Sequence, residues 1–395
     1  MLLNLERLHA MMEAEGLDAV VATSPENVTY TSGYWALSQW IRRGPQTYVV
    51  WPARGRGAPC VVASTGLLDL LADQDVWVRD VRRFGSFVVD RDPQARLDPV
   101  ESRQAELFEL PDCGTAGDAL LGVLSDLGLA RARVAVDETG IAPAVDRQLR
   151  AAMPEAAFVP GFEFLRRVRA VKTPAEIDRL RRAAHIAEAS IEAALAIAAP
   201  GVSETEMGRA FHARTVAEGG LPVLGCIGTG PRSAMANVQP SARLLQAGDV
   251  IRFDVGGRFE HYRADIARIA VVGEPPARVA RYHEALKRGV DRAYDIIRPG
   301  VKTSDVFDEV VATVRREGIP HYRRSHVGHG IGIDGYDLPD LTAVSPDVFE
   351  EGMVVCVETP YYELGFAGLQ VEDMAVVRRD GLESLMRSSR ELRVV

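Results

Sequence analysis

The stretch VIRFDVGGRFEHYRADIAR, residues 250–268, begins as an apolar run and carries two aspartates, Asp254 and Asp265, that are 11 residues apart. Asp254 ends the apolar run VIRFD, and Asp265 follows a short polar segment. Apolar runs that end in carboxylates are typical of paired strands that bring their last residues to one point. A lone aspartate after a strand is more often a turn residue or a helix cap, so the interpretation depends on partners elsewhere.

Three further candidate ligands lie later in the chain: His329 in the glycine-rich HVGHGIG, Glu358 at the end of MVVCVE, and Glu372, 14 residues after Glu358, in LQVED. Four carboxylates and one imidazole make a hard site of mostly oxygen ligands. Such a site suits divalent Mn, Co, Fe or Zn better than a thiolate site would. Two bridged ions of this kind can activate water at neutral pH. The sequence therefore predicts a dinuclear metal site.

The ligand pattern resembles the pita-bread metallopeptidases, a family that includes prolidase, aminopeptidase P and methionine aminopeptidase, with metal-free creatinase as a relative. The family signature Asp, Asp, His, Glu, Glu falls on Asp254, Asp265, His329, Glu358 and Glu372. The spacings of 11 and 14 residues match the prolidase and aminopeptidase P branch, as does Tyr262. The segments 17–35 and 168–187 also resemble that branch. The resemblance implies a hydrolase that holds two divalent metal ions and prefers proline after the scissile bond.

The organisation of the chain predicts two α/β domains. A chain of 395 residues is long for one domain. We place a creatinase/prolidase-like N-terminal domain at residues 1–165 and a pita-bread catalytic domain at residues 166–395. Near the boundary, Thr173 and Pro174 predict the start of a long helix. Its apolar face is formed by Ile177, Leu180, Ala184, Ala187, Ile191 and Leu195.

Alternating strands and helices are expected in the N-terminal domain. A helix is predicted over residues 4–16 and another over residues 116–129. Strands are predicted over residues 17–23, 47–53, 59–65 and 132–139. Residues 24–27 (SPEN) read as a turn, and residues 55–59 and 99–114 read as loops.

The second domain contains an internal repeat. Residues 199–220 and 298–319 align without gaps, and their shared proline, glycine and valine positions are 99 residues apart, beginning at Pro200 and Pro299. Each copy reads as a turn, a capped helix and a glycine stop. Two similar capped helices can arise by chance, but a duplicated unit also predicts a sheet with pseudo-twofold symmetry. The pita-bread fold has this internal symmetry.

The resemblance also assigns roles within the site. Asp254 would chelate one metal, Asp265 would bind one or both, Glu372 would bridge, and His329 would hold one. Glu358 would additionally act as the general acid/base, since a carboxylate beside activated water can take its proton. His326, three residues before His329, corresponds to the first histidine of the family's HxxGH motif, which contacts the substrate. Arg268 has two possible interpretations: it either pairs with a ligand carboxylate or is a surface charge.

Several positions depart from the peptidase pattern. The family's catalytic Pro-His after Gly-Pro is replaced by Ala236 and Asn237, and its His-Glu after the metal histidine is replaced by Tyr336 and Asp337. Asn237 and Tyr336 can still donate hydrogen bonds, so both remain candidate catalytic residues. Gln370 stands where a prolidase often has arginine, which puts recognition of a substrate carboxylate in doubt. Ala267 replaces a usual threonine, a smaller change.

Composition excludes several other classes of protein. A net charge of −9 argues against a nucleic-acid partner. The four cysteines form no CxxC pair, which argues against a disulfide framework or a zinc ribbon, and Cys226 and Cys356 read as small core residues. No apolar run suggests a signal peptide or a membrane span. We therefore expect a soluble cytoplasmic protein, and the family resemblance suggests a homodimer.

Three functions remain open from the sequence. The leading one is a metal-dependent Xaa-Pro dipeptidase or aminopeptidase P-like hydrolase. The alternative is a hydrolase or lyase acting on a small non-peptide substrate, as in creatinase or ectoine hydrolase. A binding protein on a retired enzyme fold is the third, although such a protein has little need for five ligands.

Overall fold

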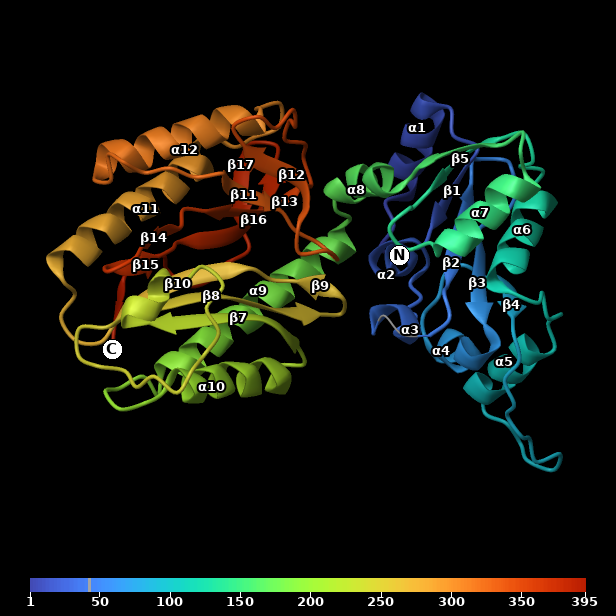
Figure 1. Cartoon of the computed structure of the whole chain (residues 1–395), viewed down its shortest axis with the longest axis horizontal. Helices are drawn as coiled ribbons and strands as arrows, with labels where there is room; N and C mark the ends of the chain where they lie inside the picture. The colour runs from blue at the N-terminus through green and yellow to red at the C-terminus, as the bar shows by residue number, and fades with distance from the viewer. Residues whose placement is uncertain (42–43) are drawn as a thin grey trace. The chain divides into compact units, whose positions relative to one another are not determined.

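The computed structural model describes residues 1–41 and 44–395, which form two compact units, Met1–Arg169 and Ala170–Val395. The predicted boundary near residue 165 falls within the helix α8 (Phe162–Ala170). Figure 1 shows that each unit has its own sheet and its own helices, and each is described by itself below.

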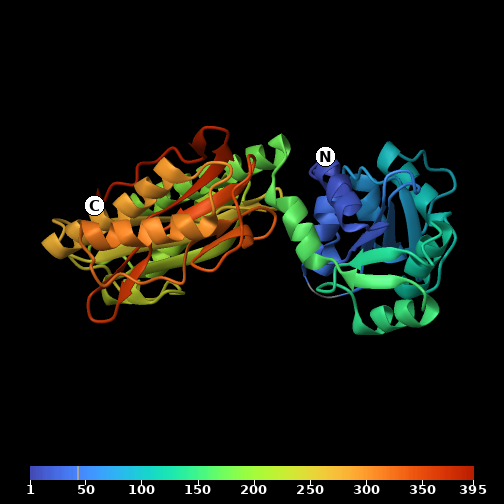
Figure 2. The same cartoon turned by 90° about the horizontal axis from the view of Figure 1, so that it is seen from above.

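The first unit is built on a mixed sheet of six strands in the order β4-β3-β2-β1-β5-β6. The strands are β1 (Ala19–Ala22), β2 (Tyr48–Pro52), β3 (Cys60–Ser64), β4 (Asp80–Phe84), β5 (Arg133–Val136) and β6 (Ala157–Pro160). Every residue of β1 and β2 is buried. Both faces of the central strands are therefore covered, as is usual where helices flank a sheet. Figure 2 shows the helices of this unit around its sheet.

The helices of the first unit are α1 (Leu5–Glu15), α2 (Pro25–Ser32), α3 (Leu37–Trp40), α4 (Leu68–Asp73), α5 (Pro99–Phe108), α6 (Ala116–Asp126), α7 (Pro143–Ala152) and α8, with the 3-10 turn η1 (Thr65–Leu67). Two sequence expectations were wrong here. SPEN is the start of α2, because the Ser24 side chain caps it. The expected loop at 99–114 contains α5, whose capping box joins Asp98 and Glu101 and which buries no residue.

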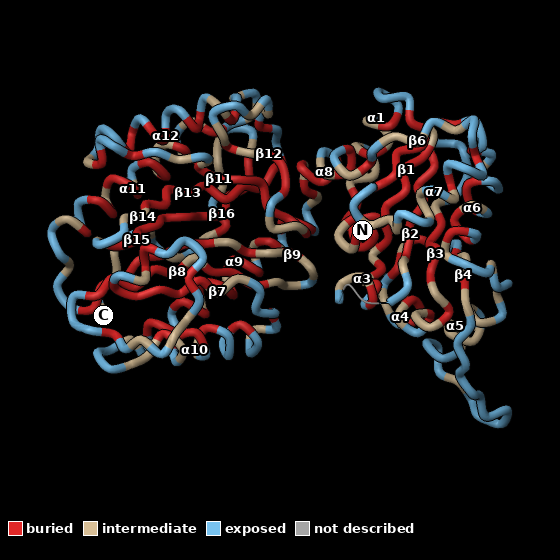
Figure 3. Tube along the Cα trace, viewed as in Figure 1, coloured by how far each residue is buried: buried red, intermediate tan, exposed pale blue. Residues whose placement is uncertain are grey.

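The second unit is built on a sheet whose main path is β12-β11-β13-β16-β10-β8-β7. The strands of that path are β7 (Leu221–Thr229), β8 (Val250–Phe259), β10 (Ile266–Val271), β11 (His326–Gly330), β12 (Asp337–Thr342), β13 (Val354–Glu358) and β16 (Glu372–Arg378). Three short strands pair with inner strands of this path: β9 (Tyr262–Arg263) with β8, β17 (Gly381–Ser384) with β16, and β18 (Arg393–Val394) with β10. In a separate two-stranded sheet, β14 (Tyr361–Glu363) pairs with β15 (Ala367–Leu369). Figure 3 shows buried residues along the central strands.

Two pairs of helices pack beside this sheet. The pairs are α9 (Pro174–Leu195) with α10 (Glu204–Ala217), and α11 (Ala277–Ile296) with α12 (Thr303–Glu317). Helix α9 begins at a capping box formed by Thr173 and Glu176, and all six predicted apolar positions on its face are buried. No helix in the described ranges is both long and apolar enough to cross a bilayer.

The internal repeat is confirmed in the backbone. In the first copy, the Gly201 N–H donates to Leu245 O and the Glu204 N–H donates to Arg243 O. The second copy repeats both bonds with donors 99 residues later, from Gly300 to Phe349 and from Thr303 to Asp347. The halves of the sheet correspond as well, since β7, β8 and β10 follow α9 and α10, whereas β11, β13 and β16 follow α11 and α12. Figure 1 shows each helix pair beside its own half.

Candidate metal centre

The carboxylates of the site lie in one row across the sheet. In the strand register Asp254 on β8 pairs with Ala267 on β10, Ala267 with Glu372 on β16, and Glu372 with Glu358 on β13. Directly paired residues in antiparallel strands point to the same face of the sheet. The pairing therefore brings together three of the predicted ligands from both halves of the unit. The small side chain of Ala267 lies between them.

A close approach of two backbone segments places Asp265 at the end of this row. Asp265 directly precedes β10 and shares the face of Ala267 two residues later. A Cβ atom on Gly256 of the neighbouring strand would lie 1.7 Å from the Ala264 carbonyl oxygen. Only glycine permits this approach. Nearby, the buried Tyr262 hydroxyl lies 3.0 Å from Oε1 of Glu176, which ties β9 to the start of α9.

The protonation state of the His329 imidazole suits a metal ligand. Its Nδ1 lies 2.9 Å from the carbonyl oxygen of Gly330, so Nδ1 carries the proton and Nε2 keeps its lone pair. Burial lowers the pKa of His329 below its usual value, which keeps the ring neutral. Nε2 of His329 and Oδ1 of Asp265 are both buried and have no hydrogen-bond partner among the described residues. Buried polar atoms normally have a partner, so these two unsatisfied atoms among the predicted ligands are consistent with a site for a cation.

The candidate ligand atoms form two groups that share Glu372. Atoms of Asp254, Asp265 and Glu372 lie within 4.8 Å of one another, and so do atoms of His329, Cys356 and Glu372. The sequence analysis interpreted Cys356 as a core residue and missed its place in this cluster. It could have been found from its position two residues before Glu358, since alternate residues of a strand share a face. Burial, followed by the charge of Glu372, raises the pKa of the Cys356 thiol well above its usual value.

The carboxylates repel one another in the absence of a cation. Burial raises the pKa of Asp254 to about 6, and Arg252 offsets this only in part. Burial and then the charge of Asp254 raise the pKa of Asp265 well above its usual value. Burial and then the charge of Asp265 do the same for Glu372. Divalent cations would compensate the negative charge that burial and mutual repulsion make unfavourable here, so these carboxylates fit bound divalent metal ions.

Glu358 differs from the other carboxylates because hydrogen-bond donors surround it. The Nε2 atom of His326 lies 2.8 Å from its Oε1 atom, and Gln370 donates to its Oε2 atom at 3.3 Å. Burial would raise the pKa of the Glu358 carboxyl, but the hydrogen bond from His326, with a smaller contribution from the charge of Arg324, outweighs it and lowers the pKa. Glu358 is therefore ionised at neutral pH and able to accept a proton.

Arg252 is a site residue that the sequence analysis missed. Its side chain is fully buried and donates through all five N–H groups: Nε to Ser233 O, Nη1 to Asp254 Oδ2 and Gln370 Oε1, and Nη2 to Met235 O and Ala236 O. These bonds are 2.7 to 3.0 Å long. Arg252 stands two residues before Asp254, and that spacing on a strand was the signal available in the sequence.

Gln370 is fixed at both ends of its amide. Its Oε1 atom accepts from Arg252 and from the Tyr362 hydroxyl, each at 3.0 Å. Its Nε2 atom donates to Glu358 and, at 3.1 Å, to Glu372. The network assigns the orientation of this amide, and the side chain has no group left for a substrate.

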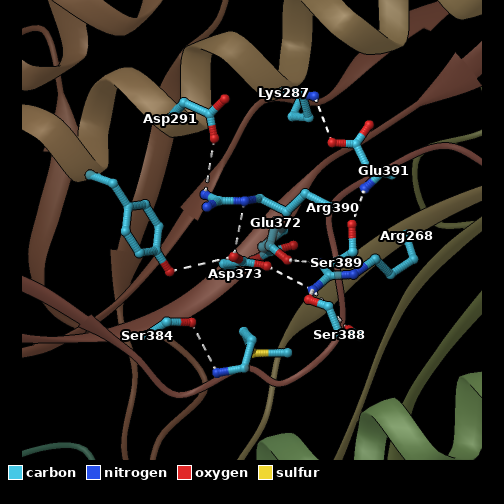
Figure 4. A network of polar contacts seen from close by, with 12 residues as sticks. Arg268, Lys287, Asp291, Glu372, Asp373, Ser384, Ser388, Ser389, Arg390 and Glu391 are labelled. Carbon is cyan, nitrogen blue, oxygen red and sulfur yellow. Dashed lines mark hydrogen bonds and ion pairs between the residues drawn. The ribbon is translucent and has the colours of Figure 1, made fainter.

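Arg268 holds the strand that carries Glu372. Its Nη1 atom donates to the main-chain oxygen of Glu372 at 2.8 Å, and Nη2 lies 2.8 Å from Asp373 Oδ1. Figure 4 shows this pair within a network that includes Ser388 and Arg390. Arg268 is buried, so its interpretation as a surface charge was wrong, and its carboxylate partner is the neighbour of a predicted ligand.

The two candidate replacements for the family histidines lie in different surroundings. Tyr336 stacks on His329 with ring centroids 4.2 Å apart, although 61% of the tyrosine is exposed. Burial of its hydroxyl and then the charge of Asp265 raise the pKa of this phenol well above its usual range. Asn237 lies at an exposed turn after η2 (Gly230–Ala234), directly after the carbonyls that Arg252 binds. Asp337 is buried, and its Oδ2 atom lies 3.8 Å from Lys172.

Comparison with known proteins identifies both units. Residues 178–379 match the family model described as metallopeptidase family M24. Residues 4–171 match the model described as the creatinase/prolidase N-terminal domain. These matches confirm the predicted resemblance and the predicted pair of domain types.

Relatives match along the whole chain. An Xaa-Pro dipeptidase of Lactobacillus delbrueckii subsp. lactis is 22% identical, with 100% of this chain and 99% of the relative covered. The crystal structure of dipeptidase PepE from Mycobacterium ulcerans superposes with a TM-score of 0.79 at 27% identity, covering 99% of this chain and 96% of that one. An Xaa-Pro dipeptidase structure from Bacillus anthracis gives a TM-score of 0.81 at 22% identity, covering 99% of both chains.

The raised pKa of Asp254 predicts a pH-dependent stability difference in protein kept free of metal by a chelator. The folded pKa of about 6 exceeds the unfolded value of about 4, so wild type loses stability as pH rises between the two. Asp254→Asn removes this ionisation and keeps an acceptor for Arg252. At pH 7 we expect the free energy of unfolding of the variant to exceed that of wild type by about 1–3 kcal/mol.

Thermal and denaturant unfolding at pH 7 and pH 4 measure this difference, with exposed Asp380→Asn as the matched control. The advantage of Asp254→Asn should shrink toward pH 4, and added divalent metal should favour wild type. A difference between the variant and wild type that does not change with pH would contradict the prediction.

Proposed function

Because the chain belongs to the metallopeptidase family M24, we propose that it is a dinuclear-metal hydrolase that cleaves Xaa-Pro peptide bonds, as a dipeptidase or an aminopeptidase P-like enzyme. The observation that carries the proposal is the row of Asp254, Glu372 and Glu358 across the sheet, with unsatisfied buried atoms of Asp265 and His329 close to it. The relatives named Xaa-Pro dipeptidase supply the substrate class.

The residues support two ions rather than one. Asp254 and Asp265 lie with Glu372 in one group of ligand atoms, and His329 lies with Glu372 in the other, which suits Glu372 as the bridging ligand. Mn, Co, Zn and Fe all accept this donor set. When bound, such ions supply Lewis acidity that polarises a carbonyl and activates water.

Side chains of the protein then carry out the proton transfer and donate hydrogen bonds. Glu358, ionised and hydrogen-bonded to His326, accepts a proton from the attacking water and returns it to the leaving amine. Tyr336 keeps its phenolic proton and can donate it in a hydrogen bond to the oxygen that gains charge. Arg252 and Gln370 hold Asp254, Glu358 and Glu372 in place and do not meet the substrate.

A second candidate is a hydrolase or lyase of a small non-peptide substrate, such as one with a C–N bond outside a peptide. Tyr336 and Asn237 at the positions of the usual histidines favour it, since neither group carries a positive charge at neutral pH. A screen of Xaa-Pro dipeptides against small amides separates the two candidates. Turnover of small amides without turnover of any Xaa-Pro peptide would replace the first proposal by the second.

Glu358→Gln tests the acid/base assignment. The variant keeps the shape of the side chain but removes its ability to accept a proton, so turnover should fall by roughly 10²- to 10⁴-fold. Metal analysis should still show close to two ions per chain in wild type and most of that in the variant. Exposed Glu351→Gln is the matched control and should behave as wild type. Near-normal turnover with metal bound would show that the base lies elsewhere.

Tyr336→Phe tests the role of the phenol. The change removes only the hydroxyl and keeps the ring stacked on His329, so the unfolding temperature should change little. On the best substrate from the screen, kcat/KM should fall by up to roughly 10²-fold, as expected when one donor to a developing charge is lost. An unchanged kcat/KM would remove Tyr336 from the mechanism and leave Asn237 and His326 as candidates.

A further inference from the structure

A second arginine, Arg324, lies beside Tyr362 near the metal centre, and it differs from Arg252 in having no hydrogen-bond or ion-pair partner among the described residues. The Cζ atoms of Arg252 and Arg324 lie 5.0 Å and 5.7 Å from the centroid of the Tyr362 ring. Within residues 1–41 and 44–395, no group accepts a hydrogen bond from Arg324, and its Nε atom is buried and unsatisfied. A half-buried guanidinium without an acceptor suits an anion that binds there.

A short chain of contacts connects Arg324 to Glu358. Its guanidinium lies over the Tyr362 ring, the Tyr362 hydroxyl donates to Gln370 at 3.0 Å, and Gln370 donates to Glu358 at 3.3 Å. Glu358 is the group that returns a proton to the leaving amine in the function proposed above. In a dipeptide, the leaving amine and the free carboxylate belong to the same amino acid. A cation beside the proton donor is therefore positioned to meet the carboxylate of the leaving residue.

Other polar groups near Glu358 are already engaged. Arg252 uses all five of its donors, and the Gln370 amide is bonded at both ends. His326 bonds Glu358 through Nε2 and lies 3.0 Å from the Ser325 hydroxyl through Nδ1. The planar fork of a guanidinium matches a carboxylate in two parallel hydrogen bonds.

We propose that Arg324 is a specificity-determining residue that binds the free carboxylate of the substrate's leaving residue, which makes the enzyme selective for dipeptides. This inference rests on the proposed function for its substrate. It also accounts for the absence of an arginine at position 370, because the cation comes from the segment before β11 instead of from the link between β15 and β16.

The test compares Ala-Pro with Ala-Pro amide, which lacks the carboxylate, on metal-loaded protein. Wild type should prefer the acid, and Arg324→Gln should reduce that preference by about 10- to 100-fold, mainly through KM, as expected when a hydrogen-bonded charge pair is lost. Arg324→Lys should restore part of it. Exposed Arg323→Gln is the matched control. Metal content and unfolding temperature should stay as in wild type.

A binding measurement separates failure of the inference from failure of the proposed function. Calorimetric titration of proline and prolinamide needs no turnover, and wild type should bind proline more tightly, with the difference lost in Arg324→Gln. The inference is overturned if wild type shows no preference for the acid or if Arg324→Gln keeps it. It is also overturned if the preference disappears instead in Arg263→Gln, since that half-buried arginine, beside Gly335, also has an unsatisfied Nε.

Discussion

The carboxylates of the metal centre impose the constraint on which the rest of the second unit depends. Asp254, Asp265 and Glu372 offer ligand atoms within 4.8 Å of one another, with both aspartates half-buried and Glu372 buried. Two like charges 4 Å apart repel by about 4 kcal/mol at the effective dielectric constant of 20 suited to protein sites. The single guanidinium of Arg252 pairs with one of these carboxylates, so further positive charge is required. That requirement is the physical reason why the site suits metal ions.

The duplicated architecture meets this constraint by dividing the ligands between its halves. The first half supplies two aspartates from β8 and the start of β10, and the second supplies two glutamates from β13 and β16. The two halves meet where Ala267 pairs with Glu372. The symmetry of the backbone is broken by the groups around the carboxylates, because Arg252 pairs with Asp254 while His326 pairs with Glu358. This difference leaves Glu358 as the ionised base.

The sequence was sufficient for the fold and for the candidate ligands because these depend on periodic patterns and on a specific spacing. The helix α9 follows from Thr173 and its apolar face, and the repeat follows from residues 99 apart. Residues 99–114 were misread because α5 buries no residue and so lacks an apolar stripe. Arg252 was passed over inside an apolar run, since a charged residue facing a buried site leaves the apolar pattern of its strand almost unchanged.

Positions near His329 show a different limit. His326 lies three residues before His329, whereas the two histidines of HxxGH are four residues apart, and the pairing of β11 with β12 shifts register on both sides of His329. When the spacing between the two histidines differs from that of the family motif, the motif cannot predict which side chain reaches the site. Only the structure places the His326 ring against Glu358.

The presence of the guanidinium at position 252, with a glutamine at position 370, determines what this cation can do in the site. An arginine at position 370 would extend from the link between β15 and β16, whereas Arg252 extends from β8 and meets three carbonyl oxygens of residues 233–236. These bonds use three of its five donors, and Asp254 and Gln370 use the others. Arg252 thereby fixes the segment that leads to Asn237 relative to the metal ligands. A guanidinium whose five donors are all bonded stabilises the site but has no donor left for a substrate. Any anionic group of the substrate must therefore be bound by another cation.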